Sequence, residues 1–317
     1  MRPVPGDEEL REWLAGRLDA AHVEARLSLE ALGPQPALGT RLFLRPIEKW
    51  LFSEPKMRAA LRLMGLYERG RRNALDIRVT PHRVSIPRLP QAFHGYRILQ
   101  LSDLHLDMND ELPDALIRCV AALEYELAVL TGDYRYATYG SSERCVRALA
   151  QVRAALDAPV YAVLGNHDSL RIAPALEDMG MRVLLNESAV IERAGQHLYL
   201  AGVDDPHFFK LADVRRARSG IPASAPSILL AHSPEIYAEA AAAGFDALLC
   251  GHTHGGQIRL PGQIPLLYNA RCPRRFCAGA WTYRNLEGYT SVGVGASLID
   301  VRLNCPPEVV LHSLALA

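Results

Sequence analysis

The sequence predicts an α/β fold, in which short buried strands alternate with helices. Apolar runs rich in strand-forming residues recur at 97–102, 127–131, 160–164, 227–231 and 247–250. Stretches with helical spacing separate these runs, and such alternation is typical of α/β proteins. Polar residues and glycine follow each run directly. Because ligands of open α/β sheets bind beyond the carboxyl ends of the strands, we expect the functional site at these ends.

The first 73 residues are predicted to form a helical N-terminal appendage to a domain at 74–317. Apolar residues from Asp7 to Leu32 recur at spacings near three and four, and Gly33-Pro34 follows them. This pattern indicates one capped amphipathic helix. A second amphipathic helix is predicted from Pro55 to Arg69.

A β-hairpin is predicted at the start of the second domain. Apolar and polar residues alternate over 75–79 and again over 84–86, and Thr80-Pro81-His82-Arg83 interrupts the alternation. Alternation on both sides of a proline-containing break is typical of two strands joined by a turn.

The composition is that of a globular protein with a large core. The chain has 317 residues, of which 49% are hydrophobic, and its net charge is zero. Balanced charge gives no overall basic surface, so no nucleic-acid binding is expected. No run approaches the roughly 18 apolar residues that span a bilayer, and the first residues lack the order of a secretory signal. We therefore expect a cytoplasmic protein.

The region from Arg41 to Arg72 is an exception to the balanced charge. It holds nine basic and three acidic residues, a net charge of +6, together with aromatic residues such as Trp50 and Phe52. A basic, aromatic, amphipathic segment can lie on an anionic membrane, which would place the protein at the inner face of the membrane. Alternatively, the segment buries Trp50 and Phe52 against the catalytic body and its arginines are solvated. Both interpretations stay open.

Six cysteines are scattered along the chain without a CxxC pair, which is typical of a reduced protein with unlinked thiols. Cys272 and Cys277 are near enough in the sequence to approach each other, as a disulfide or as half of a small metal site. No second Cys/His pair at zinc spacing completes such a site. Unlinked structural thiols are the simpler expectation.

Polar clusters that follow the predicted strands contain potential metal ligands. They supply three carboxylates, five histidines and one carboxamide, namely Asp103, His105, Asp133, Asn166, His167, Asp168, His232, His252 and His254. Oxygen and imidazole donors without a thiolate are the ligand set of a two-metal hydrolytic site. In Asp103-x-His105 and His252-x-His254, an extended backbone would point both side chains to the same side. This donor set predicts hydrolysis of phosphate esters.

The series D-x-H, G-D, G-N-H-D, H and G-H-T-H resembles the calcineurin-like metallophosphoesterase superfamily, from about Tyr96 to the C-terminus. The segments 101–106, 251–257 and 304–308 are similar to a bacterial branch that includes membrane-associated phosphodiesterases and UDP-2,3-diacylglucosamine pyrophosphohydrolases. The resemblance implies a four-layer β-sandwich flanked by helices. It also implies binuclear-metal-dependent hydrolysis of phosphodiester or pyrophosphate bonds by a metal-bridging hydroxide.

The resemblance further implies a role for each residue of the series. One divalent ion would be held by Asp103, His105 and His254, the second by Asn166, His232 and His252, and Asp133 would bridge both. These donors admit manganese, iron, zinc or magnesium. By the family pattern His167 contacts the phosphate and assists the leaving group, and Asp168 orients His167. His197 and His207 are interpreted as structural.

Tyr134 and Arg135 directly follow Asp133, which predicts that they lie at the mouth of the cleft. There Tyr134 would stack on a base or sugar and Arg135 would bind a second phosphate. Alternatively, this is a solvated loop whose tyrosines pack flat. The stretch 261–276, with Arg271, is a second candidate wall of the substrate site.

Three functional hypotheses stay open. The first is a phosphodiester or pyrophosphate hydrolase for a lipid-linked or nucleotide-linked substrate, held near an anionic membrane by the basic appendage. The second is a soluble phosphoesterase for small nucleotides. The third is a non-catalytic interaction module on the same fold. The third is disfavoured, because every expected ligand and the His167-Asp168 pair are present.

Overall fold

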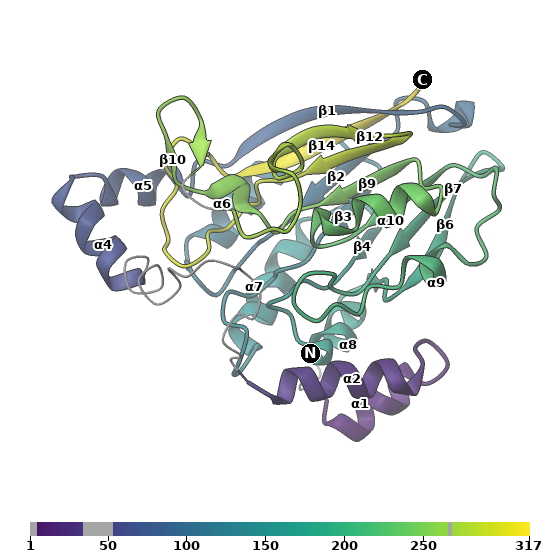
Figure 1. Ribbon diagram of the computed structural model, residues 1–317, viewed down its shortest axis with the longest axis horizontal. Coiled ribbons are helices and arrows are strands. Elements are labelled where there is room, and N and C mark those ends of the chain that lie inside the picture. Colours follow the sequence, from purple (N-terminus) through teal and green to yellow (C-terminus); the bar gives the residue numbers. More distant parts are fainter. Residues whose placement is uncertain (1–4, 34–52, 266–267) are drawn as a thin grey trace.

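The computed structural model describes residues 5–33, 53–265 and 268–317. Two six-stranded sheets pack face to face, with strand orders β1-β14-β2-β3-β4-β5 and β12-β13-β9-β8-β7-β6. Helices cover the outer faces of both sheets (Figure 1). This arrangement of helix, sheet, sheet and helix layers confirms the predicted α/β sandwich.

The elements have the following bounds. The first sheet contains β1 (Arg78–Ile86), β2 (Arg97–Leu101), β3 (Leu127–Leu130), β4 (Val160–Ala162), β5 (Met181–Val183) and β14 (Glu308–Leu316). The second contains β6 (Glu187–Arg193), β7 (Gln196–Gly202), β8 (Ser227–Leu230), β9 (Ala247–Cys250), β12 (Gly279–Tyr283) and β13 (Leu286–Thr290), and β10 (Arg259–Leu260) and β11 (Ile264–Pro265) form a small separate ribbon. The helices are α1 (Asp7–Leu14), α2 (Ala20–Ala31), α4 (Glu54–Leu63), α5 (Tyr67–Asn73), α6 (Leu112–Val120), α7 (Glu143–Ala154), α8 (Ala173–Asp178), α9 (Val214–Arg218) and α10 (Tyr237–Ala242).

The five strands expected to precede polar clusters are all present, as β2, β3, β4, β8 and β9. Successive side chains point to opposite faces, so Ile98 lies in the core between the sheets and Leu99 lies in the core under the helices. Because both faces are buried, these strands are continuous apolar runs. Within the first sheet β2, β3 and β4 are parallel, and β8 and β9 are parallel in the second. Within each sheet, the carboxyl ends of these strands therefore lie at the same edge.

The predicted hairpin at 75–86 is wrong. Residues Arg78–Ile86 form the single strand β1, which pairs in parallel with β14 and places Pro81 opposite Leu311. Strand β1 is at the edge of its sheet, and an edge strand tolerates proline because only one side of it donates to a neighbour. The partner strand comes from the opposite end of the chain, so a local pattern could not reveal it.

The helix predicted from Asp7 to Leu32 is broken into α1 and α2, and Gly16 between them has a φ of 81°. The second predicted helix is likewise broken into α4 and α5, with Gly65 at a φ of 68°. Glycine accepts these left-handed conformations without a side-chain clash.

The helices α1 and α2 pack against the strand-bearing domain. Leu10, Leu14, Val23 and Leu27 are buried in the same core as Leu99. These two helices therefore cover part of the domain. The division at residues 73 and 74 stays a prediction, and Trp50 and Phe52 lie outside the described residues.

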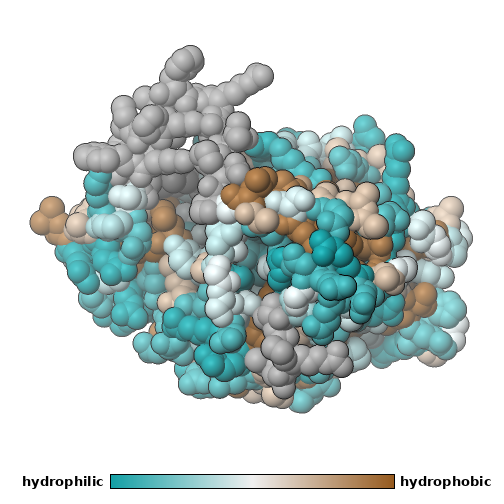
Figure 2. All heavy atoms as spheres, turned by 90° about the horizontal axis from the view of Figure 1, so that it is seen from below, coloured by the Kyte–Doolittle hydropathy of each residue, from teal (hydrophilic) through white to brown (hydrophobic). Residues whose placement is uncertain are grey.

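None of the described helices has both the length and the apolar character needed to cross a bilayer. Hydrophilic side chains dominate the face shown in Figure 2, and apolar ones are scattered among them. Two apolar side chains at the end of α4 are strongly exposed, Leu63 at 90% and Met64 at 59%.

Candidate metal centre

The candidate site lies where the carboxyl edges of the two sheets meet. Asp103 and His105 follow β2, Asp133 follows β3 and Asn166 follows β4, whereas His232 follows β8 and His252 and His254 follow β9. A hydrogen bond joins the two sheets here, because the backbone N–H of His252 donates to Oδ2 of Asp103 at 2.9 Å. The site is therefore assembled from two sheet edges.

The first ligand cluster contains Asp103, His105 and His254. Their donor atoms lie within 4.8 Å of one another, and all three residues are buried. Nε2 of His254 is 3.2 Å from Nε2 of His105 and 3.4 Å from Oδ1 of Asp103. The two imidazole rings are stacked, with centroids 5.1 Å apart.

The second cluster contains Asp133, His232 and His252, whose donor atoms also lie within 4.8 Å of one another. Nε2 of His232 is 3.2 Å from Oδ2 of Asp133, 3.1 Å from Nδ1 of His252 and 3.0 Å from Oδ1 of Asn166. Asn166 thus joins this cluster. Oδ2 of Asp133 is also 3.8 Å from Nε2 of His105, so this carboxylate lies between the two clusters.

Several candidate ligands have a left-handed backbone, and this corrects the extended conformation expected for Asp103-x-His105 and His252-x-His254. The φ angles are 52° and 42° for the first pair and 73° and 49° for the second. Asp133 has a φ of 57°. Non-glycine residues rarely adopt this region, and such strain is concentrated at functional sites.

Two glycines leave room for the carboxylates. A Cβ atom on Gly165 would lie 2.2 Å from Oδ1 of Asp133, and a Cβ atom on Gly251 would lie 2.3 Å from Oδ2 of Asp103. Both contacts are far below the separation of unbonded atoms. Any larger residue at these two positions would therefore displace the carboxylates.

Burial sets the charge of most histidines in the clusters. It lowers the pKa of His105 to about 4 and the pKa values of His252 and His254 well below their ordinary value. These imidazoles are neutral near pH 7, so each can offer a lone pair to a metal.

Asp133 and His232 form a charged pair at the centre of the site. Burial favours the neutral imidazole of His232, but the charge of Asp133 outweighs it and raises the pKa of His232 to about 10. Burial also opposes ionisation of Asp133, yet the charges of His232 and His167 hold the pKa of Asp133 well below its ordinary value. A divalent ion at this cluster would take the place of the proton on His232.

The residues present fit divalent metal ions. Nε2 of His252 is buried and has no hydrogen-bond partner among the described residues. An unpaired buried nitrogen is costly unless it binds something. The remaining donors are carboxylate and carboxamide oxygens and imidazole nitrogens, which suit manganese, iron, zinc or magnesium.

His167 faces the clusters but is held by Thr138. Nε2 of His167 is 4.0 Å from Oδ2 of Asp133, and Nδ1 pairs with the Thr138 hydroxyl at 2.8 Å. Among the described residues, Asp168 forms no hydrogen bond or ion pair with this ring. Its carboxylate accepts hydrogen bonds from the backbone N–H groups of Asp133, Tyr134 and Gly165 at 2.7, 3.0 and 2.8 Å. The expectation that Asp168 orients the ring is wrong, because Asp168 organises the loop backbone.

Tyr134 and Arg135 do not face the cleft. Tyr134 is fully buried, and its hydroxyl donates to the Val163 carbonyl at 2.6 Å. Arg135 is 2% exposed and donates to the carbonyl of Tyr139 at 2.8 Å. Both predicted substrate roles are wrong, because the loop turns these side chains into the core. Arg271 is exposed, and its substrate role stays a prediction.

Two groups beside the clusters were missed from sequence. The ring of His207 lies 4.1 Å from the ring of His252, and Nδ1 of His207 pairs with Glu235 at 2.8 Å. Arg302 is fully buried and lies 3.5 Å from Nδ1 of His254. The sequence did contain a pattern that could have indicated His207. The polar cluster Asp204-Asp205-Pro206-His207 follows the apolar end of β7, just as the other polar clusters follow their strands. Nothing in the spacing indicated Arg302.

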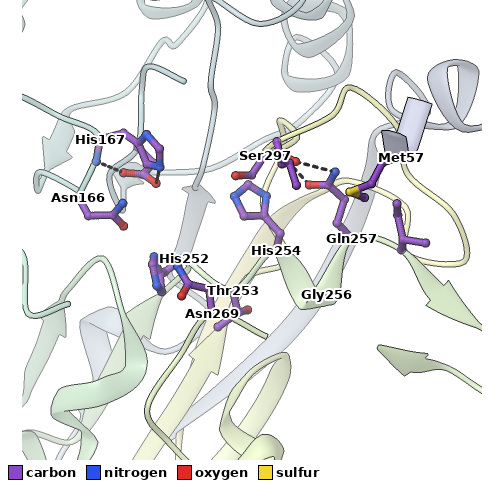
Figure 3. Close-up of a pocket in the computed structure, with 13 residues that line it drawn as sticks. Met57, Asn166, His167, His252, Thr253, His254, Gly256, Gln257, Asn269 and Ser297 are labelled. Atoms are coloured by element: carbon purple, nitrogen blue, oxygen red, sulfur yellow. Dashed lines mark hydrogen bonds and ion pairs between the residues drawn. The ribbon is translucent and has the colours of Figure 1, made fainter. Parts of the chain in front are cut away.

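The clusters open into a cavity of about 210 Å³. Figure 3 shows Asn166 and His167 on one side and His252 and His254 opposite them, with Met57 farther along the cavity. Ile258 and Leu298 line the cavity together with Met57, so a wall beside the polar clusters is apolar. The cavity therefore offers a polar surface and an apolar surface side by side.

Comparison with known proteins agrees with this geometry. A family model described as calcineurin-like phosphoesterase matches residues 96–256. The chain is similar to phosphodiesterase YaeI of Escherichia coli strain K12, with 32% identity over 69% of this chain and 82% of that protein. It is also similar to UDP-2,3-diacylglucosamine pyrophosphatase LpxG of Chlamydia trachomatis serovar D, with 25% identity over 58% of this chain and 71% of that protein.

Among solved structures, the fold is similar to the sulfate thiohydrolase SoxB of Thermus thermophilus. The TM-score is 0.44 at 12% identity, and the match covers 72% of this chain and 57% of that one.

Proposed function

The chain belongs to the calcineurin-like phosphoesterase family, and from that premise we propose that it hydrolyses phosphodiester or pyrophosphate bonds with two divalent metal ions. The first ion would be held by Asp103, His105 and His254, and the second by Asn166, His232 and His252. Asp133 would bind both. The observation that carries this proposal is the position of Oδ2 of Asp133 between the two buried clusters, 3.2 Å from His232 and 3.8 Å from His105.

Two ions in these positions would lower the pKa of a water molecule and neutralise charge on the phosphate oxygens. Protein groups prepare the site for that chemistry. The backbone N–H of His167 donates to Oδ1 of Asp133 at 2.9 Å, which fixes this carboxylate and leaves Oδ2 facing the clusters. Such fixed polar groups cost no reorganisation during the reaction.

We assign His167 the contact with the phosphate and the donation of a proton to the leaving oxygen. Its side chain is 23% exposed and lines the cavity, so a substrate can reach it. Thr138 fixes the ring through Nδ1, which leaves Nε2 free to face the substrate. Proton donation by a positioned histidine contributes roughly 10² to 10⁴ in rate.

We propose a substrate in which a lipid or other apolar group adjoins the phosphate. The apolar wall of Met57, Ile258 and Leu298 beside the polar clusters supports this class over a bare small nucleotide. The relative LpxG is named for a diacylated substrate. The strongly exposed Leu63 and Met64 lie on the same helical segment as Met57, which would bring the cavity to an anionic membrane.

The test of catalysis is hydrolysis of bis(p-nitrophenyl) phosphate by chelator-treated protein before and after addition of manganese. Activity should appear with manganese and be lost from Asp133→Asn. Elemental analysis should find close to two ions per chain. Correctly folded protein that binds the ions but hydrolyses no member of a broad ester panel would favour a non-catalytic interaction module.

The substrate class is tested by comparing UDP-2,3-diacylglucosamine with UDP-N-acetylglucosamine, which shares the pyrophosphate and carries a single acetyl group in place of the two acyl chains. A higher kcat/KM for the diacylated compound should fall in Met57→Glu. Equal values for both compounds would favour the small-nucleotide alternative.

Sedimentation with phosphatidylglycerol vesicles tests whether the protein binds an anionic membrane. The wild type should sediment with the vesicles, and Leu63→Glu should weaken that binding. Wild-type protein that does not sediment would refute membrane contact.

A further inference from the structure

The sulfur atoms of Cys272 and Cys277 lie in contact near the candidate metal centre. Both residues are free thiols, and their Sγ atoms are 3.7 Å apart. A disulfide has an S–S distance of about 2.05 Å, so bond formation needs a movement of less than about 2 Å within one short loop. Cys272 is partly exposed and Cys277 is buried. A reagent in solution can therefore reach the pair through Cys272.

The loop that carries this pair is bonded to the segment between two metal ligands. The hydroxyl of Thr253, which separates His252 from His254, donates to the carbonyl of Cys277 at 2.5 Å. Asn269 at the other end of the loop lines the cavity, and Figure 3 shows it beside Thr253. A movement of Cys277 would therefore act on the backbone that positions both histidines.

A second connection runs from the same loop through Glu235. The backbone N–H of Arg271 donates to Oε1 of Glu235 at 2.6 Å. The same oxygen pairs with Nδ1 of His207 at 2.8 Å, and the ring of His207 packs on the ring of His252. Glu235 is largely buried, so it has little freedom to keep both partners if the backbone of Arg271 moves.

We propose that Cys272 and Cys277 form a reversible disulfide that shifts His252 and so controls metal binding and hydrolysis at the centre. Formation of the disulfide depends only on the thiol geometry, whereas its effect on hydrolysis rests on the proposed function. Partners outside the ligand shell typically change metal affinity or activity by about 10- to 100-fold when they are disturbed. We expect metal affinity and activity to fall by about 10-fold, the lower end of that range, because the disulfide tightens the loop without removing a side chain.

The oxidant is a disulfide of the glutathione class. The thiolate of Cys272 attacks one sulfur of oxidised glutathione and expels a glutathione thiolate, which leaves a mixed disulfide on Cys272. The thiolate of Cys277 then attacks the Cys272 sulfur and expels the second glutathione thiolate. Two protein thiols are oxidised, one oxidised glutathione is reduced to two thiols, and the two protons from the protein pass to the glutathione thiolates.

The experiment uses the full chain loaded with manganese and treated with oxidised glutathione or with dithiothreitol. Free thiols are then alkylated with N-ethylmaleimide and counted by intact mass. The oxidised protein should carry two fewer alkyl groups, recover them with dithiothreitol, and show a roughly 10-fold weaker manganese affinity with a matching fall in kcat/KM.

Cys272→Ser and Cys277→Ser should each lose the response, and Cys119→Ser is the matched control because Cys119 is another partly exposed thiol. Cys119→Ser should respond like the wild type. An unchanged thiol count, or glutathione that stays attached to Cys272, would overturn the disulfide. A disulfide that forms while manganese affinity and kcat/KM stay within twofold would overturn the control of the metal centre. Since thiol counting and manganese affinity do not require hydrolysis, they decide the proposal even if no substrate is cleaved.

Discussion

Gly165 offers a direct test of the geometry proposed for the metal centre. A Cβ atom at this position would lie 2.2 Å from Oδ1 and 2.5 Å from the backbone nitrogen of Asp133, whereas ordinary contacts begin at 3.4 Å. In Gly165→Ala the carboxylate or the loop must therefore move by about 1 Å. The φ of Gly165 is outside the left-handed region, so the effect is steric and does not arise from backbone strain.

The expected cost follows from that displacement. Moving a catalytic group by about 1 Å lowers the rate by roughly 10²-fold, equivalent to about 2.7 kcal/mol in activation free energy. Overpacking should also lower the free energy of unfolding by about 1 to 3 kcal/mol. Because Asp133 would bind both ions, metal content should fall together with activity.

The assays are kcat/KM for bis(p-nitrophenyl) phosphate with manganese, elemental analysis of the purified protein, and urea unfolding. Gly6→Ala is the control, because no atom lies within 4 Å of a Cβ built there and its backbone is also outside the left-handed region. If Gly165→Ala keeps both metal content and kcat/KM within about threefold of Gly6→Ala, Asp133 does not have the proposed role.

Three further predictions follow from individual contacts. In Thr138→Val the ring of His167 loses its hydroxyl partner, so kcat should fall roughly 10-fold at unchanged metal content. Thr138→Ser keeps a hydroxyl and should restore kcat. Equal kcat in both variants would contradict the role of Thr138 in positioning His167. Burial lowers the pKa of His312 well below its ordinary value, so below pH about 6.5 the unfolded chain binds a proton that the folded chain does not. The free energy of unfolding should therefore decrease as pH falls, and this group contributes up to about 1.4 kcal/mol per pH unit. Urea unfolding at pH 7.5 and 5.5 should show a smaller decrease for His312→Asn than for the wild type. Arg26 is fully buried, lies 3.6 Å from the buried carboxylate of Asp204 and donates to the Asp168 carbonyl at 2.8 Å. Because Arg26→Met removes this cation from beside Asp204, it should lower the free energy of unfolding by about 3 kcal/mol in the same assay, and a change below about 1 kcal/mol would contradict this.

Much of the site could be predicted because its signals are local. A strand that is buried on both faces must be apolar, and a polar cluster must interrupt it where the chain leaves the sheet. These requirements placed Asp103, His105 and Asp133 after strands that the structure contains. The same rule applied to β7 would have indicated His207.

Other predictions failed because distant residues decided them. Alternation around Pro81 fits a hairpin, but the C-terminal strand β14 offers β1 a full-length partner. Asp168 follows His167 directly, yet its carboxylate accepts hydrogen bonds from amide groups of the neighbouring loop, and the His167 ring pairs with Thr138 instead. Adjacency in the chain does not fix the direction of two side chains when the backbone between them turns.

By itself, the sequence determined the α/β class, the strands that end at the site and the set of candidate metal ligands, because burial and donor chemistry are properties of each segment. Only the tertiary structure decided that Tyr134 and Arg135 point into the core, that Thr138 holds His167, and that the sulfurs of Cys272 and Cys277 meet beside the centre. Those outcomes depend on how loops from two sheets pack against one another, and the free energy of that packing is not contained in any one segment.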